Sequence, residues 1–264
     1  MNYKSDFADE FTYKKDEYKK VNKKYKHDVN YTCIDIKKDN NQFNKGKGRY
    51  ISIDFKSLLD DKIQLTVSEV LIEALNKFYK IKKDDKILIV GLGNDKIIAD
   101  SLGPSVADKI MVTNHLFTLL KDNKEDINRV CVFTPKVMGQ TGLESADLVE
   151  AVTKLFKPNI IIVIDALATN SFNRINKVIQ LSNTGIAPGS GVGNYRKQID
   201  YKTLKVKVVA IGVATVVKAN NIIKEYEEED LILTPKSISE DIGYLSNIIA
   251  SSINRYIHSD NLSN

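Results

Sequence analysis

The chain has 264 residues, of which 42% are hydrophobic and 28% are charged, and its formal net charge is +5. This apolar fraction excludes intrinsic disorder for most of the chain and allows a large buried core. Cys33 and Cys131 lie far apart, which excludes a disulfide framework and a four-cysteine zinc site and favours a reducing compartment. The opening residues lack an apolar signal segment, and no run approaches the ~18–20 apolar residues of a spanning helix. We therefore expect a cytoplasmic protein without a membrane partner.

The positive charge is concentrated near the N-terminus. Residues 11–26 contain seven lysines against Asp16 and Glu17, and the rest of the chain is balanced. Tyrosines between these lysines leave a local nucleic-acid contact open, but a solvated or mobile leader is the preferred interpretation. We therefore expect no direct nucleic-acid partner.

Short, continuous apolar runs alternate with helix-like stretches, a pattern typical of strands covered on both faces. The expected strands are 50–55, 87–90, 130–134, 160–164 and 206–211, with 177–181 as an additional strand. The expected helices are 68–79, starting at a capping-box-like Ser68, then Pro104 to about Leu120, 143–156 and 237–257. This order predicts an α/β fold with a mostly parallel or mixed central sheet flanked by helices.

Two acidic residues follow expected strands. Ligand sites of open parallel sheets lie beyond the carboxyl ends of the strands, and Asp165 directly follows the run 160–164, whereas Asp100 follows the run 87–90 by ten residues. Two neighbouring carboxylates cannot both ionise cheaply, so one could act as a general base on water and the other as a protonated acid, as in peptide hydrolysis. Alternatively, Asp165 is satisfied by backbone donors and Asp100 caps the helix at Pro104. Spacing leaves both interpretations open.

Two glycine-containing loops, 135–144 and 183–196, could bring backbone N–H groups to a substrate. We expect the segment from Gly189 to Gly193 to donate hydrogen bonds to an oxyanion. The candidate substrate-binding or oxyanion residues are Gly139, Thr141, Gly189, Ser190, Gly191, Gly193 and Asn194.

Other catalytic templates do not fit. Lys96 stands where a dinucleotide fingerprint beginning at Gly91 needs a small residue, and Pro188 replaces the first glycine of a GxSxG motif. Neither a P-loop nor an HExxH motif occurs. We therefore expect no cofactor and no metal.

Four parts of the chain carry a family resemblance. They are 91–116, 134–149, 164–196, and the pair 208–217 and 233–242, with MGQTG, IDALA and TGIAPGSGVGN in that order. They resemble the germination proteases of spore-forming bacteria. The resemblance implies an atypical aspartic endopeptidase with a three-layer phosphorylase/hydrolase-like fold, shared with hydrogenase maturation endopeptidases. It also implies that Asp100 and Asp165 are catalytic and that small acid-soluble spore proteins are the substrates, in the forespore and spore core.

The resemblance further implies a self-processing zymogen, because family members remove a short propeptide after an acid that precedes a bulky apolar residue and an alanine. Asp6, Phe7 and Ala8 match this pattern, although an ordinary acidic turn is the alternative. Tyr3 stands where family substrates carry an acid. The expected parts are a propeptide (1–6), a lysine-rich segment (7–48), a peptidase domain (49–258) and a tail (259–264).

The sequence departs from the family pattern at Lys136, Ala214 and Lys218, none of which is a candidate catalytic residue. The resemblance implies a homotetramer, but an insertion typical of the family is missing around residues 225–230. Two alternatives remain. One is a metal-dependent maturation-type endopeptidase, and the other is a non-catalytic spore protein that binds peptide or nucleic acid.

Overall fold

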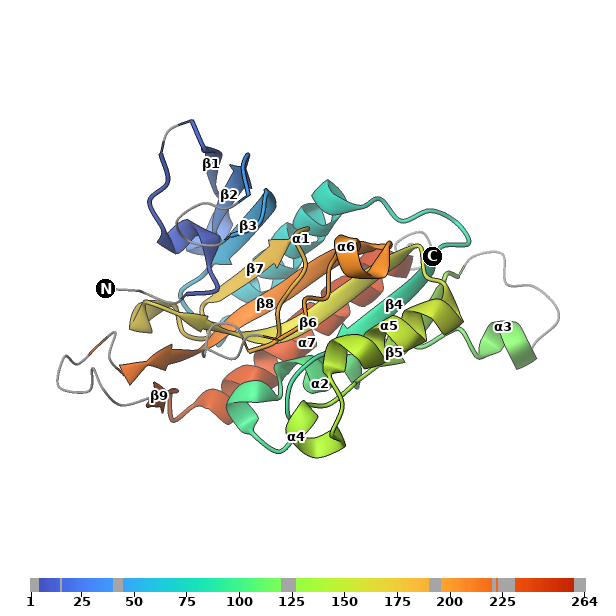
Figure 1. The fold of residues 1–264 in the computed structure, drawn as a ribbon. Coiled ribbons are helices and arrows are strands. Elements are labelled where there is room, and N and C mark those ends of the chain that lie inside the picture. Colours follow the sequence, from blue (N-terminus) through green and yellow to red (C-terminus); the bar gives the residue numbers. More distant parts are fainter. Residues whose placement is uncertain are drawn as a thin grey trace.

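A computed structural model describes residues 5–14, 16–39, 45–119, 127–189, 196–219, 222 and 231–258. The strands of these residues form one mixed sheet in the order β1-β2-β3-β7-β8-β6-β4-β5, and β9 pairs with the end of β8 (Figure 1). Strands β8, β6, β4 and β5 are parallel, and the remaining pairs are antiparallel. The strands are β1 (Tyr18–Lys24), β2 (Asn30–Ile36), β3 (Gly48–Asp54), β4 (Lys86–Gly91), β5 (Arg129–Phe133), β6 (Ile160–Thr169), β7 (Val178–Ser182), β8 (Lys207–Lys218) and β9 (Ile232–Leu233).

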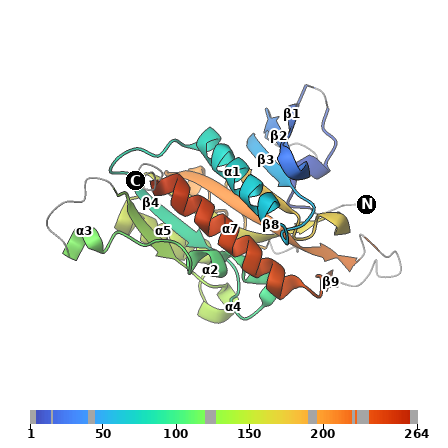
Figure 2. The ribbon, with the colours of Figure 1, turned by 180° about the vertical axis from the view of Figure 1, so that it is seen from behind.

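Helices cover both faces of the sheet. On one face lie α1 (Asp61–Phe78), α2 (Leu102–Ala107) and α7 (Ile238–His258), which Figure 2 shows in front of the strands. On the other lie α5 (Ser145–Phe156) and α6 (Tyr201–Leu204). The shorter helices are α3 (Leu116–Leu119), α4 (Met138–Thr141), η1 (Ala8–Glu10), η2 (Lys26–Asp28), η3 (Ile98–Asp100) and η4 (Phe172–Arg174). The predicted α/β fold with a mixed central sheet between helices is thus confirmed.

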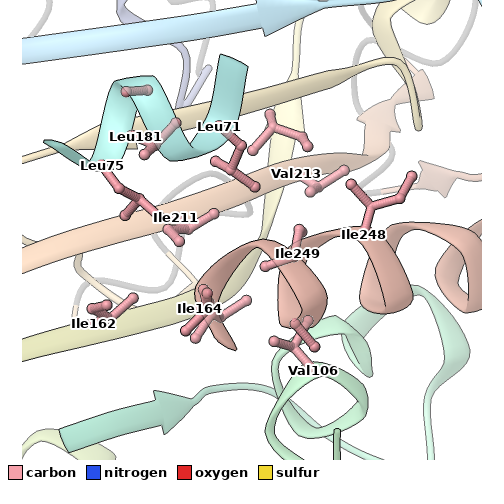
Figure 3. Close-up of a cluster of buried hydrophobic side chains, with 14 of the residues drawn as sticks. Leu71, Leu75, Val106, Ile162, Ile164, Leu181, Ile211, Val213, Ile248 and Ile249 are labelled. Carbon is pink, nitrogen blue, oxygen red and sulfur yellow. The ribbon is translucent and has the colours of Figure 1, made fainter. Parts of the chain in front are cut away.

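The main core lies between the sheet and the face that carries α1, α2 and α7. Side chains alternate along β6, so Ile162 and Ile164 point to this core, whereas Ile161 and Val163 point to α5. In Figure 3, Ile211 of β8 and Ile249 of α7 lie in the same cluster as Ile164. Burial on both faces explains why the central strands read as continuous apolar runs.

Two helices have boundaries that differ from those expected. Helix α1 begins at Asp61, capped by the Asp60 carboxylate, which accepts a hydrogen bond from the Lys62 N–H (2.8 Å). Ser68 instead lies buried inside the helix, with its hydroxyl 2.8 Å from that of Ser252. Helix α2 ends at Ala107, because the chain then turns to bond β5 through the N–H of Thr113.

Where the structure describes it, the lysine-rich leader is part of the central sheet rather than an appendage to it. Strands β1 and β2 pair in antiparallel register and extend the sheet beyond β3. Most side chains of β1 are exposed, which is why the sequence shows no apolar alternation there. Exposed lysines on an outer strand also oppose pairing with another chain.

The residues just before this hairpin belong to the core. Phe7 is fully buried against Leu167, Val178 and Ala214. It lies on the α5 side of the sheet, because Leu167 points to the same face of β6 as Val163, two pairs of residues earlier. A second cluster joins two residues of this segment to the sheet, and its buried members are Ala8, Tyr13, Ile34, Ile36 and Tyr50. The segment 7–13 therefore crosses the sheet face from β6 towards β2 and covers it there in place of a helix. Within the described part of the chain, no helix combines the length and apolar character of a membrane span.

Candidate active site

The candidate site lies where β6 extends beyond the end of its neighbour β4. Strand β4 ends at Gly91, opposite Ile164, and the next N–H, that of Leu92, donates to the Ile164 carbonyl oxygen (2.8 Å). Strand β6 continues to Thr169 alongside β8. The edge of β6 beyond Ile164 is therefore available to segments other than β4.

Asp165 is the first residue of β6 beyond this point. Its side chain is 4% exposed, and Oδ1 accepts a hydrogen bond from the neighbouring Ala166 N–H (2.9 Å). Burial raises the pKa of Asp165 well above its ordinary value, and the negative charges of Asp100 and Asp6 raise it further. The arrangement therefore favours the protonated carboxyl group, as a general acid requires.

Asp100 lies on η3, in the loop that follows β4. Its Oδ2 accepts a hydrogen bond from the Asn94 N–H (2.8 Å), which also bonds the Asp100 carbonyl oxygen (3.1 Å). Burial raises the pKa of Asp100, and the Asn94 bond opposes that shift. The helix-capping alternative does not apply, because Ser101 occupies the N-cap position of α2 and no side-chain cap bond is present there.

Glycines position the loop that carries Asp100. Gly93 has φ +113°, and a Cβ atom at this position would lie 2.0 Å from the Asp100 carbonyl oxygen. A Cβ atom at Gly103 would lie 2.2 Å from the Leu92 carbonyl oxygen and 2.7 Å from that of Ile164. These glycines therefore allow the loop and the start of α2 to pack directly on the end of β6.

Gly93→Ala should displace Asp100 and lower both stability and peptide cleavage. A non-glycine residue in a sparsely populated backbone region costs about 1–3 kcal/mol, and a displacement of ~1 Å at a reacting group can cost about 10²-fold in rate. Thermal unfolding and a cleavage assay would measure the two effects. The control is Gly243→Ala in α7, since a Cβ atom there meets nothing within 4 Å. Equal behaviour of the two variants would contradict the positioning role of Gly93.

The N-terminal segment docks beside these aspartates. The Asp6 N–H donates to the Ala168 carbonyl oxygen (3.0 Å), and the Ala168 N–H donates to Oδ2 of Asp6 (2.9 Å). The side-chain amide of Gln180 in β7 bonds the same segment twice. Its Nε2 donates to the Asp6 carbonyl oxygen (3.0 Å), and its Oε1 accepts from the Ala8 N–H (2.9 Å). The Asp6–Phe7 bond is thus held against β6 and β7.

An ion-pair network anchors the residues that follow. Arg174 forms ion pairs with Asp9 (2.8 Å), Glu10 (3.0 Å) and Asp54 (2.9 Å), and its guanidinium lies 5.0 Å from the centre of the Phe7 ring. The Glu10 carboxylate also accepts from the Asn170 N–H (2.7 Å), from the Ser5 hydroxyl (2.6 Å) and from the Thr169 hydroxyl. On the N-terminal side of Asp6, the Ser5 carbonyl oxygen accepts a hydrogen bond from Lys45 Nζ (2.8 Å).

The other candidate residues are placed differently. Gly139 and Thr141 lie exposed in α4, where the Thr141 hydroxyl bonds within its own turn. Helix α4 is tied to the loop after β4 by a hydrogen bond from Gln140 Nε2 to Asp95 (3.1 Å), beside the ion pair of Asp95 with Lys136. Gly189 lies in a turn with φ +71°. Ser190, Gly191, Gly193 and Asn194 lie outside the described residues. The described residues contain no cluster of three or more His, Cys, Asp or Glu side chains suited to a metal ion.

Sequence reasoning missed Gln180 and Arg174. Gln180 is 6% exposed within a strand that is buried throughout, VIQLS, and a polar side chain in such a run must find partners. That signal could have drawn attention to it. Arg174 belongs to a short 3-10 helix, and nothing in the local sequence indicates its acidic partners.

Comparisons with known proteins identify the family of the chain. A sequence model of the family described as germination protease matches residues 1–228. A germination protease of Clostridium acetobutylicum is 36% identical over 89% of this chain and 86% of its own length, and one of Clostridium perfringens is 34% identical over 86% and 84%. One of Bacillus subtilis is 42% identical over 72% of this chain and 54% of its own length.

Among solved structures, the [NiFe] hydrogenase maturation protease HycI from Thermococcus kodakarensis KOD1 aligns with a TM-score of 0.39 and 18% identity. That alignment covers 68% of this chain and 98% of the other. The extent of the family match and the identities to the clostridial proteins decide the assignment. The chain belongs to the germination protease family.

Proposed function

We propose that the protein is a spore endopeptidase of the aspartic type that cuts small acid-soluble spore proteins through Asp100 and Asp165. The observation that carries the proposal is the Asp165 carboxyl, which is buried on β6, the strand on which the segment from Asp6 docks. Burial raises the pKa of this carboxyl well above its ordinary value, and the charge of Asp100 raises it further. Membership in a protease family supports the reaction class. The spore-protein substrates follow from the family resemblance.

The two carboxyl groups have different environments, which supports different roles. Asp100 is partly exposed and would act as the base that takes a proton from the attacking water. The water oxygen bonds the peptide carbon while the carbonyl electron pair moves to oxygen. Asp165 would then give its proton to the amine nitrogen as the carbon–nitrogen bond breaks. Because the groups interact, their protons leave in steps that belong to the pair.

We also propose that the chain is a zymogen that releases residues 1–6 by cutting between Asp6 and Phe7. The docking of both residues beside β6, and the charge interaction of Asp6 with Asp165, support this position for the bond. The resemblance also supports a homotetramer in the cytoplasm of the forespore and the spore core. Analytical ultracentrifugation of the purified protein would test the assembly.

Intact-mass spectrometry tests the reaction directly. The full chain should lose residues 1–6 over time, and it should then cut a small acid-soluble spore protein before an apolar residue followed by alanine. Asp100→Asn should do neither, and a chelator should change neither rate. Cleavage abolished by the chelator would favour the metal-dependent alternative. An intact substrate under all conditions, combined with salt-sensitive binding, would favour the non-catalytic alternative.

A further inference from the structure

Gln180 holds the chain on both sides of Phe7. Its side chain extends from β7, and each end of its amide bonds one flanking peptide group, the Asp6 carbonyl oxygen through Nε2 (3.0 Å) and the Ala8 N–H through Oε1 (2.9 Å). A primary amide presents a donor and an acceptor together, so it binds an extended segment as a neighbouring strand would. Phe7 is extended, with φ −87° and ψ 121°, as this pairing requires.

The apolar contacts fix the same register. Phe7 is fully buried between Leu167, Val178 and Ala214, and Ile186 packs against this group. Val178 lies two residues before Gln180 and faces the same side of β7. The ring and the two amide bonds therefore hold residues 6–8 at a single position along the sheet.

We infer that Gln180 is a catalytic residue that donates a hydrogen bond to the carbonyl oxygen of the bond between Asp6 and Phe7 as this bond is cut. This inference rests on the proposed function. When the water oxygen adds to the Asp6 carbonyl carbon, the carbonyl electron pair moves to the oxygen that Nε2 already contacts. A buried donor at this distance stabilises the developing charge, and loss of such a donor costs about 10²–10³-fold in rate.

Burial explains why the contact suits this task. Gln180 is 6% exposed, so its Nε2 donor lies away from bulk water, where a hydrogen bond to a developing negative charge is stronger. Both hydrogen bonds of the Gln180 side chain go to the N-terminal segment rather than to the sheet. A buried amide that is satisfied by the segment to be cut is arranged for that segment, not for holding the strands together.

The test is the rate at which Gln180→Glu releases residues 1–6. A Glu carboxylate still accepts from the Ala8 N–H but cannot donate to the Asp6 carbonyl oxygen. We expect the rate at neutral pH to fall by about 10²–10³-fold, with hydrogen exchange of the Ala8 amide still slow. The rate relative to wild type should recover in acid, because a protonated Glu regains a donor. The matched control is Gln64→Glu in α1, which removes a similar bond, from Gln64 Nε2 to the carbonyl oxygen of Leu58 just before the helix (2.7 Å).

The outcomes separate the two proposals. If wild type releases residues 1–6 and Gln180→Glu does so at the same rate, the role of Gln180 is overturned while the proposed function stands. A slow variant with rapid exchange at Ala8 would also overturn it, since Gln180 would then only dock the segment. If wild type itself neither releases residues 1–6 nor cuts the spore protein, the proposed function fails.

Discussion

Asp165→Asn is expected to abolish peptide cleavage and, at the same time, to raise the stability of the fold at neutral pH. Cleavage is lost because an amide cannot deliver the proton that the leaving amine needs. Stability rises because burial and the charges of Asp100 and Asp6 disfavour an ionised carboxylate at this position, and Asn removes that penalty. For a chain of this size, each 1 kcal/mol recovered raises Tm by roughly 2–4 °C.

The gain in stability from Asp165→Asn should increase as the pH rises. At a pH below the ordinary value of about 4, the unfolded and folded chains both hold the proton, so the substitution changes little. The pKa of Asp165 is lower in the unfolded chain than in the folded protein, so the unfolded chain loses its proton first as the pH rises. The folded protein is therefore progressively destabilised until the pH reaches the raised pKa of Asp165 in the folded state. The difference in Tm between the variant and the wild type should therefore widen over this interval.

Thermal unfolding between pH 3 and pH 8 measures this dependence, and Asp95→Asn is the control. Asp95 is exposed, and hydrogen bonds from Lys136 and Gln140 lower the pKa of its carboxyl group. Its neutralisation should bring no gain in stability. A pH-independent effect of Asp165→Asn would contradict the raised pKa, and retained cleavage would remove Asp165 from the reaction.

Arg174→Met should destabilise the protein more than Gly93→Ala does. The Arg174 guanidinium is 15% exposed and pairs with Asp9, Glu10 and Asp54. Removing one partner of a buried ion pair leaves uncompensated charges and costs about 3–5 kcal/mol. Urea denaturation at pH 7 gives the free energy of unfolding directly.

The loss of stability in Arg174→Met should be smaller in acid, because the Asp54 carboxyl group, left without its partner, can take up a proton. Arg174 lowers the pKa of Asp54 against the raising effect of burial, so its removal frees that pKa to rise further. The control is Lys197→Met, whose ion pairs with Asp147 and Glu150 are exposed, and it should unfold almost as the wild type does. Equal losses in the two variants would show that the Arg174 network contributes no more than a surface pair.

The central strands were predictable because both of their faces are buried. The apolar runs at 87–90 and 160–164 fall within β4 and β6. Asp165 was expected to follow its strand, but it lies inside β6, which continues to Thr169 beside β8. Asp100 was found because it lies in the loop that follows the run 87–90. Spacing alone could not decide whether it caps a helix or belongs to the site. Its contact with the Asn94 N–H depends on the close approach that Gly93 permits, a feature of tertiary packing.

The features that could not be predicted from the sequence mainly involve the N-terminal segment. The lysines of β1 face solvent, so the strand shows no apolar period, and its pairing is set by backbone bonds to β2. Burial of Phe7 depends on three strands that are remote in sequence. The contacts that Gln180 and Arg174 make with residues 6–10 also span more than 160 positions. Local patterns carry no information about such distant pairs.

The path of residues 7–13 over the sheet also determines how much of the N-terminus the protein can lose. Among the described residues, Phe7 is the first whose side chain is fully buried, and every position from Phe7 to Tyr13 lies on the stretch that shields β2, β3, β7 and β8. A cut before Phe7 therefore leaves the hydrophobic surface sealed, and a cut a few residues later would bare Ile34, Ile36 and Tyr50 to water and to other molecules. The boundary between expendable leader and structural chain thus coincides with a single peptide bond, the one that the aspartates are proposed to cut.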